Sequence, residues 1–330
     1  MPFPVVITLA VAGVPGGDRL SLADATVVAD TAQQAGAIAL RLLDQPATDS
    51  AAPSARTVDP SVAAAYLAGR QSRIGYLVDV PTSHQAPYNT ARRVLSIDRA
   101  TDGQIGIVLR SGAGDEVSDA VVDQPGPEDS AARWSEYAEV LTRLWESFPR
   151  SALIGDQDAA VVADDTAIHP IDHVGDHYTV SGPLDGPSSR QGRPVLVVTD
   201  VATVGWDRSA ALADVVLVSA EEAVTAAEHL AAAAERVGRP RREIALLGRV
   251  TVDSRREPTA EVLTGRLAAF FATHRLDGLE LSPRGDVEAV LSVVATVVTA
   301  LAEPPGITLR DSLGLGLPEP VLPEPIGARA

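Results

Sequence analysis

The densest group of side chains capable of chemistry lies in the segment HPIDHVGDH. Its histidines and aspartates are His169, Asp172, His173, Asp176 and His177. Imidazoles and carboxylates are common zinc ligands, and two histidines four residues apart on a helix would face the same way. Pro170 and Gly175 argue against a helix here, and in a hairpin the histidines would scatter over both faces. The pattern therefore favours a structural hairpin, and we predict no metal site.

Three other polar residues stand at or just beyond the ends of predicted strands. Asp44 closes the apolar run AIALRLLD, Thr82 follows the apolar run 74–80, and His84 lies in the loop after it. We take His84 as the candidate catalytic group on the substrate side, against the alternative of a solvated loop histidine. Asp44 and Thr82 are equally compatible with a structural role at a strand end, because such residues often satisfy backbone amides.

The segment PYNTARRVLSIDRATDGQIGIVLRSG predicts a helix, a tight turn and a strand. The turn is expected at residues 101–103 and the strand at 105–109. Arg92 and Arg93 are of a residue type that binds phosphate. We favour a structural role, in which one of them pairs with Asp98 or Asp102 and holds the end of the helix.

Composition excludes several classes of protein. The 330 residues carry a net charge of −17, whereas nucleic-acid binders need a basic face. Cysteine is absent and all 27 basic residues are arginine, which removes disulfides, thiol nucleophiles and lysine chemistry. No apolar run reaches the roughly 18 residues of a membrane span. The apolar start MPFPVVITLA lacks a basic segment before it, so we predict a first buried strand and a cytoplasmic protein.

Apolar runs alternate with amphipathic segments along the whole chain, and the last of these segments predicts a helix over residues 287–302. Eight strand candidates are apolar throughout, which is typical of strands buried on both faces of a parallel sheet. Eight βα pairs in one chain of this length predict a single-domain TIM barrel. A doubly wound open sheet is the alternative, although GVPGGD after the first strand lacks the dinucleotide-binding spacing. The expected strand ends lie near Ala12, Asp44, Val80, Arg110, Thr199, Val218, Val250 and Leu281.

Several segments resemble the luciferase-like flavin-dependent monooxygenases, in the branch that oxidises nitrilotriacetate, EDTA and dibenzothiophene sulfone. They are similar to that branch's motifs and follow its order along most of the chain. The segments are RLLD, DPSVAAAYLAGRQSRIG, TSHQAPYNTARRVLSIDRATDGQIG, WSEYAEVLTRLWESF, IHPIDHVGDHYTVSGPLDGPSSRQGRPVLVV and TLRDSLGL.

The resemblance implies a TIM barrel that binds reduced FMN at the carboxyl ends of its strands. It also implies a separate flavin reductase that supplies the reduced FMN, activation of oxygen, and a small organic substrate. The family positions expected to contact FMN correspond here to Asp44, Thr82, Val108, Trp134, Ala202 and Thr203.

Several of these positions depart from the family pattern. A tryptophan–asparagine pair is replaced by Ile107 and Val108, and a tyrosine is replaced by Trp134. A serine that holds the FMN phosphate becomes Ala202, and a nearby glycine becomes Asp200. Two like unit charges ~4 Å apart at an effective dielectric near 20 repel by roughly 4 kcal/mol, so Asp200 predicts weak FMN affinity.

The chain is also shorter than the family pattern. IALLGRVTVDSRREPTAEVLTGRL passes from a strand directly into a helix, without the family's long lid insertion. A missing lid would leave the reaction open to water. We expect a barrel over residues 1–315 and a proline-rich tail over 316–330.

Two further readings of the function stay open. One is a degenerate paralogue that keeps the barrel, binds flavin weakly or not at all, and serves as a partner subunit. The other is a barrel that binds a deazaflavin, as related branches do. Whichever function holds, the alanine-rich helix over 221–237 and the pairing of related enzymes through barrel helices predict a homodimer.

Overall fold

The computed structural model describes residues 2–13, 16–44, 57–83, 85–112, 129–253, 256 and 259–322. Within them, eight parallel strands form a closed ring, because β13 pairs with both β12 and β1. The ring strands are β1 (Val5–Val11), β3 (Ala39–Leu42), β4 (Gly75–Pro81), β5 (Ile105–Arg110), β10 (Val195–Val198), β11 (Val215–Ser219), β12 (Ala245–Val252) and β13 (Gly278–Pro283). The predicted TIM barrel is confirmed, and every expected strand end lies within two residues of the observed one.

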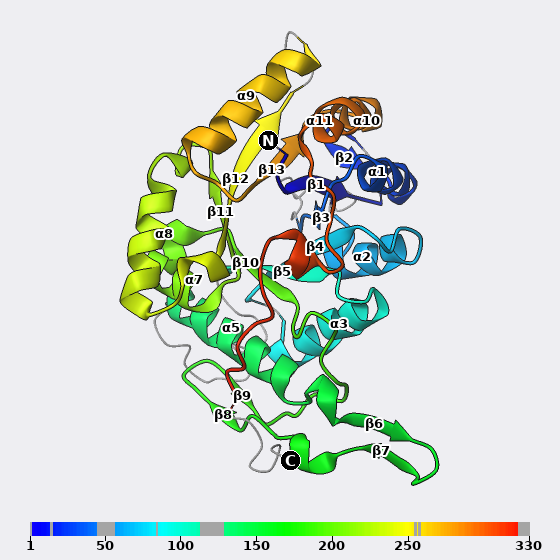
Figure 1. Ribbon diagram of the computed structural model, residues 1–330, viewed down its shortest axis with the longest axis vertical. Helices are drawn as coiled ribbons and strands as arrows, with labels where there is room; N and C mark the ends of the chain where they lie inside the picture. The colour runs from blue at the N-terminus through cyan, green and yellow to red at the C-terminus, as the bar shows by residue number, and fades with distance from the viewer. Residues whose placement is uncertain are drawn as a thin grey trace, which may run out of the picture.

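Helices surround this ring (Figure 1). They are α1 (Leu22–Gln34), α2 (Pro60–Ala68), α3 (Pro87–Ala100), α5 (Ser130–Glu146), α6 (Val201–Val204), α7 (Trp206–Leu212), α8 (Ala223–Val237), α9 (Ala260–Thr273), α10 (Val287–Val293) and α11 (Thr299–Leu301). The sequence sets several of their ends. Ser21 caps α1 by accepting from the Asp24 amide at 3.0 Å, and Gly238 ends α8 in the left-handed conformation.

The hydrophobic core has two layers. A larger layer lies between the strands and the helices and includes Ile7, Tyr76 and Trp145, all at most 1% exposed. A smaller layer fills the lower barrel interior and includes Val6, Leu77, Val108, Leu217 and Leu247. The alternation of strand side chains between these layers explains why the strands read as continuous apolar runs.

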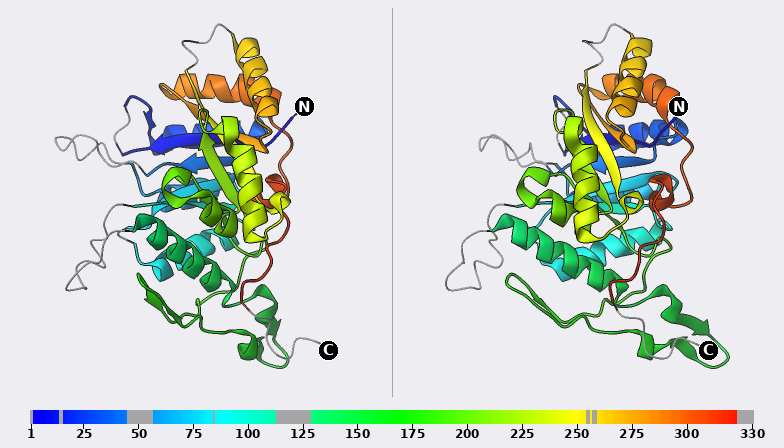
Figure 2. Two further views of the ribbon diagram at one scale, coloured as in Figure 1. Left: turned by 90° about the vertical axis from the view of Figure 1, so that its left-hand side faces the viewer. Right: turned by 60° about the vertical axis from the view of Figure 1, so that its left-hand side comes forward.

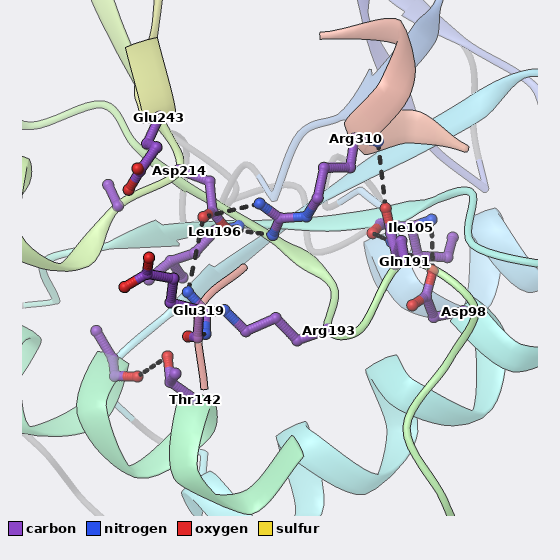
Figure 3. A network of polar contacts seen from close by, with 12 residues as sticks. Asp98, Ile105, Thr142, Gln191, Arg193, Leu196, Asp214, Glu243, Arg310 and Glu319 are labelled. Atoms are coloured by element: carbon purple, nitrogen blue, oxygen red, sulfur yellow. Dashed lines mark hydrogen bonds and ion pairs between the residues drawn. The ribbon is translucent and has the colours of Figure 1, made fainter. Parts of the chain in front are cut away.

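A short helix that the sequence patterns did not predict closes the barrel at the amino ends of the strands. This is α12 (Leu309–Ser312), drawn in red across the middle of the ring in Figure 1 and on the side of the N-terminus in Figure 2. Leu309 and Leu313 belong to the inner core layer. Arg310 donates two hydrogen bonds to the carboxylate of Asp214, at 3.1 and 2.9 Å (Figure 3). The motif TLRDSLGL thus forms the floor of the barrel.

The predicted turn at residues 101–103 meets this floor. Gly103 has φ of +92°, and a Cβ there would lie 3.0 Å from a methyl group of Thr308. The Gly103 carbonyl accepts a hydrogen bond of 2.9 Å from the amide of Leu309. Glycine is therefore required both by the backbone conformation and by the close approach of the floor helix.

Two details of the prediction for the chain are wrong. Arg92 pairs with Asp185 at 2.7 Å, and Arg93 donates to Gln85, so neither arginine reaches Asp98 or Asp102. Asp98 instead accepts from the amide of Ile105 at 3.0 Å, inside the protein. The expected helix over 287–302 is also interrupted, because Val294–Val298 forms a π-helical turn between α10 and α11.

The region between α5 and β10 contains two small hairpins, as the sequence suggested. One pairs β6 (Leu153–Asp156) with β7 (Val161–Ala163) and projects away from the barrel (Figure 1). The other pairs β8 (His173–Val174) with β9 (Thr179–Val180). None of the helices in the described ranges is long and apolar enough to cross a membrane.

Candidate active site at the barrel mouth

A buried ion-pair network lies inside the barrel, above the apolar interior layer. Arg41 on β3 contacts Asp79 on β4 at 2.7 Å and Glu280 on β13 at 3.1 Å. Arg249 on β12 contacts the same Glu280 at 2.7 Å. The side chains of Arg41, Asp79 and Glu280 are at most 4% exposed. Four of the five consecutive ring strands β12, β13, β1, β3 and β4 thus each direct one charged side chain into the barrel interior, and β1 does not.

The network is held together by strong mutual attraction. Burial lowers the pKa of Arg41, but the carboxylates of Asp79 and Glu280 outweigh burial and raise that pKa above its ordinary value. Burial likewise raises the pKa of Glu280, yet Arg41 and Arg249 outweigh it and hold the pKa below its usual range. Arg41 and Glu280 are therefore charged at neutral pH, and removing Arg41 would take from Asp79 and Glu280 the buried cation that they share.

A cavity of about 400 Å³ opens above this network, at the carboxyl ends of β1, β3, β12 and β13. Its walls are mainly polar, and Ala10, Leu43 and Pro283 supply apolar surface. Its polar and charged lining residues are Thr8, Asp18, Arg19, Arg41, Arg249, Thr251, Glu280, Ser282 and Arg284. The carboxyl ends of the strands are the face on which TIM barrels carry their active sites.

Asp44 and Thr82 lie near the mouth, but their polar groups serve the protein itself. The carbonyl of Asp44 accepts from the guanidinium of Arg110 at 2.7 Å. Burial raises the pKa of the Asp44 carboxyl, and Arg110 offsets this only in part. Thr82 is fully buried, and its hydroxyl accepts from the Gly112 amide at 3.2 Å. Neither side chain lines the cavity.

Val108 and Trp134 are both in the core. Val108 lies in the inner layer of the barrel and is 0% exposed. The indole of Trp134 is equally buried and donates its N–H to the carbonyl of Leu109 at 2.8 Å. The structure therefore uses these two side chains for packing between and within the strands.

The expected phosphate position lies at the start of α6. Ala202 and Thr203 are exposed there. Asp200 precedes the helix, and the hydroxyl of Ser111 donates a hydrogen bond to its carboxylate. A negative carboxylate with its own donor thus stands where the resemblance places an anion.

His84 lies outside the described residues. Among the three histidines of HPIDHVGDH, His173 is buried and its Nε2 lies 2.9 Å from Glu136 Oε1. Glu136 also accepts from the amides of His177 and Tyr178 at 2.9 and 2.8 Å, so it holds the hairpin together. His169 is exposed on the surface. In the described part of the chain, no three histidines, aspartates or glutamates gather in a way that could hold a metal ion.

Comparison with known proteins gives this barrel its family. The family model described as luciferase-like monooxygenase matches residues 1–288. The chain belongs to the luciferase-like monooxygenase family. The connection from β12 to α9 in this member consists of residues 253–259.

Individual relatives of this luciferase-like chain place it among the monooxygenases. It is 31% identical over 168 residues to nitrilotriacetate monooxygenase component A of Aminobacter aminovorans, a match that covers 50% of this chain and 37% of that protein. It is 29% identical to a subunit of the pristinamycin IIA synthase of Streptomyces pristinaespiralis, covering 77% of this chain and 76% of that one. The match therefore spans well under half of the first relative and about three quarters of the second.

A solved structure shows the same fold. The EDTA monooxygenase of Chelativorans sp. BNC1 superposes with a TM-score of 0.79 at 22% identity, covering 96% of this chain and 98% of that one. The predicted resemblance to the luciferase-like family is confirmed by the family model, and its relatives include nitrilotriacetate monooxygenase component A and dibenzothiophene-sulfone monooxygenase.

The residues of this luciferase-like chain do not form an FMN phosphate site of the expected kind. The expected site needs a hydroxyl and free backbone N–H groups at a helix start, and here the nearby hydroxyl of Ser111 is engaged by the carboxylate of Asp200. α6 is only four residues long, so its dipole is short. We therefore derive no reaction step through a bound flavin.

Sequence reasoning missed the ion-pair network altogether. Its signal was a charged residue inside an otherwise apolar strand: Arg41 in ALRL, Asp79 in GYLVDVP and Glu280 in GLELSP. A charge in such a position has to find a buried partner.

Proposed function

We propose that the protein is a monooxygenase that uses reduced flavin and O2 to oxidise a small organic substrate. The observation that carries this proposal is the polar cavity at the carboxyl ends of the barrel strands. The chain that forms this barrel matches the luciferase-like family over residues 1–288. A cavity of about 400 Å³ lies within the range of roughly 300–1,000 Å³ typical of small-molecule sites. Reduced flavin would supply the electrons that oxygen needs.

The same proposal treats FMN as a weakly bound co-substrate delivered by a separate flavin reductase. Asp200 places a negative charge near the phosphate position, and Ala202 offers no hydroxyl. Repulsion between unit charges ~4 Å apart costs roughly 4 kcal/mol at an effective dielectric near 20, equivalent to about a thousandfold in affinity. His84 would serve on the substrate side of the reaction.

The test is an anaerobic titration of the purified protein with reduced FMN, followed by oxygen consumption with a flavin reductase and reduced nicotinamide. Saturable binding in the micromolar range or weaker, together with oxygen transfer to a substrate from a screened set, would support the proposal. Binding of neither reduced FMN nor a reduced deazaflavin by the folded barrel would contradict it. That result would revive the degenerate partner subunit, which the monooxygenase relatives do not favour.

We further propose that the protein acts as a homodimer in the cytoplasm, where reduced nicotinamide is available to a flavin reductase. The alanine-rich α8 supports a helix–helix interface, and Val224 on it is 67% exposed. Sedimentation velocity across micromolar concentrations tests the dimer. A single species of 34.3 kDa at every concentration would rule it out.

A further inference from the structure

Arginines outnumber carboxylates among the described lining residues of the cavity at the barrel mouth, although the whole chain carries a net charge of −17. Four arginines line it against two carboxylates, those of Asp18 and Glu280. Asp79, which pairs with Arg41 from behind, supplies a third carboxylate. The arginines are Arg19, Arg41, Arg249 and Arg284. Asp79 also lies 3.7 Å from Arg110, and the described lining is rich in guanidinium groups.

The buried hydroxyl of Thr8, whose residue is 6% exposed, and the buried Nη2 of Arg249 belong to lining residues and have no hydrogen-bond partner among the described residues. A buried hydroxyl without a partner destabilises the protein, and a buried charged group without one does so more strongly. Thr8 on β1 is paired in register with Arg41 on β3. Arg249 on β12 is paired with Glu280 on β13, and β13 in turn pairs with β1. Both atoms therefore belong to the same side of the barrel.

We propose that this cavity binds a small organic carboxylate carrying a single negative charge. The carboxylate would accept hydrogen bonds from the Thr8 hydroxyl and from Nη2 of Arg249. Arginine guanidinium groups suit carboxylates because their N–H groups match the spacing of the two oxygens.

The size and walls of the cavity favour an organic ion over an inorganic one. A water molecule occupies about 30 Å³ of liquid, so an inorganic ion would leave most of the roughly 400 Å³ empty. Ala10, Leu43 and Pro283 offer apolar surface for a hydrocarbon part. A second carboxylate on the ligand would meet the carboxylates of Glu280 and Asp18, which favours a monoanion.

That this carboxylate is the substrate that the enzyme oxidises rests on the proposed function. The binding itself does not, because every residue that carries it belongs to this chain and no flavin is needed. The test is therefore made without flavin, so that a failure of the monooxygenase proposal leaves its outcome intact.

The experiment is isothermal titration calorimetry of the full chain in a low-chloride buffer with benzoate, with its uncharged isostere benzamide and with inorganic phosphate. We expect saturable benzoate binding, with benzamide and phosphate each at least about tenfold weaker, because charged hydrogen bonds are the strong ones. Arg249→Gln should weaken benzoate binding by about tenfold or more. Thr8→Val keeps the side-chain shape and should weaken binding by roughly threefold or more, while leaving the melting temperature unchanged or higher.

Arg236→Gln is the matched control, because Arg236 forms an exposed surface pair with Asp207 away from the cavity lining. It should bind benzoate as the unaltered protein does. Equal binding of benzoate and benzamide, or phosphate binding as tight as benzoate, would overturn the proposal. So would a complete lack of benzoate binding up to about 10 mM, or unchanged benzoate affinity in Thr8→Val. The Thr8 variant keeps the test decisive if Arg249→Gln fails to fold.

Discussion

The hydroxyl of Ser111, just beyond β5, donates a hydrogen bond to the carboxylate of Asp200, at the start of α6. This contact ties the ends of two neighbouring strands together and fixes a negative charge beside the expected phosphate position. It provides a local reason for the presence of an aspartate there, independent of any flavin.

The double substitution Asp200→Gly with Ala202→Ser should therefore tighten FMN binding. Removing the repulsion and adding a hydroxyl should together contribute on the order of 2–4 kcal/mol. Riboflavin, which lacks the phosphate, should respond little. Fluorescence or calorimetric titration of both ligands under reducing conditions measures the effect. An equal gain for FMN and riboflavin would assign the change to packing, and nanomolar FMN binding by the unaltered protein would refute the electrostatic account.

Arg41→Met should strongly destabilise the barrel. It removes the cation shared by Asp79 and Glu280, which are each 1% exposed as side chains, and breaking a buried pair typically costs about 3–5 kcal/mol. Urea unfolding followed by circular dichroism gives the change in unfolding free energy. Arg92→Met is the control, since its pair with Asp185 is exposed and should be worth under about 1 kcal/mol. Similar losses in the two variants would contradict the structural importance of the network.

Asp98 should make stability fall as the pH rises. Burial raises the pKa of Asp98 from 3.8 to about 7, and hydrogen bonds from Ile105 and Gln191 offset burial only in part. The pKa of Asp98 is therefore higher in the folded protein than in the unfolded chain. The contribution of Asp98 to the free energy of unfolding is fully present below pH 3.8 and is lost as the pH rises through about 7. At higher pH the cost approaches about 4 kcal/mol, at 1.36 kcal/mol for each pKa unit.

Asp98→Asn should consequently gain stability relative to the unaltered protein between pH 4 and pH 8, roughly the interval over which the Asp98 carboxyl ionises. Chemical denaturation at several pH values in this interval provides the measurement. Asp102→Asn serves as the control, because Asp102 is exposed and already has positive φ, which asparagine tolerates. A pH-independent difference between Asp98→Asn and the unaltered protein would show that Asp98 does not titrate in this range.

Two glycine substitutions should have opposite effects. Gly103→Ala forces a Cβ onto Thr308 at positive φ and should cost more than about 1 kcal/mol. Gly265→Ala, in the middle of α9 with open space around it, should stabilise by about 0.5–1 kcal/mol. Thermal unfolding of both variants tests the pair. Stabilisation by Gly103→Ala would show that the floor helix does not approach the turn this closely.

The parts of the fold that could be predicted from the sequence are those set by local pattern. Apolar runs such as VVITLAV and the amphipathic spacing of α5 predicted the strands and helices, because burial on one or both faces leaves a periodic signal. The four residues of α12 are too few to show any period. The π-helical turn at Val294–Val298 leaves no such signal either, because its residues continue the apolar pattern of a helix.

The charged cavity could not be predicted in the same way. Arg41 and Glu280 are 239 residues apart, and only the closure of the ring makes them neighbours. The resemblance to known monooxygenases led to Asp44, Thr82 and Val108, none of which lines the cavity. It did not lead to Thr8 or Arg249. The sequence of one strand does not show which of its side chains will lie at the same height inside the barrel as side chains from other strands.

The floor helix α12 also bears on the order in which the molecule folds. Gln104 donates to the carbonyl of Ile307 across 203 residues of chain, and Leu309 bonds to Gly103 beside it. Contacts between such distant residues form slowly, because a long loop has to close before they are gained. We therefore expect the floor to close late in folding, together with the pairing of β1 and β13, whose residues lie even farther apart along the chain. Until then Leu77, Val108 and Leu217 would face water from below, so a nascent or refolding chain is most prone to aggregate at this stage.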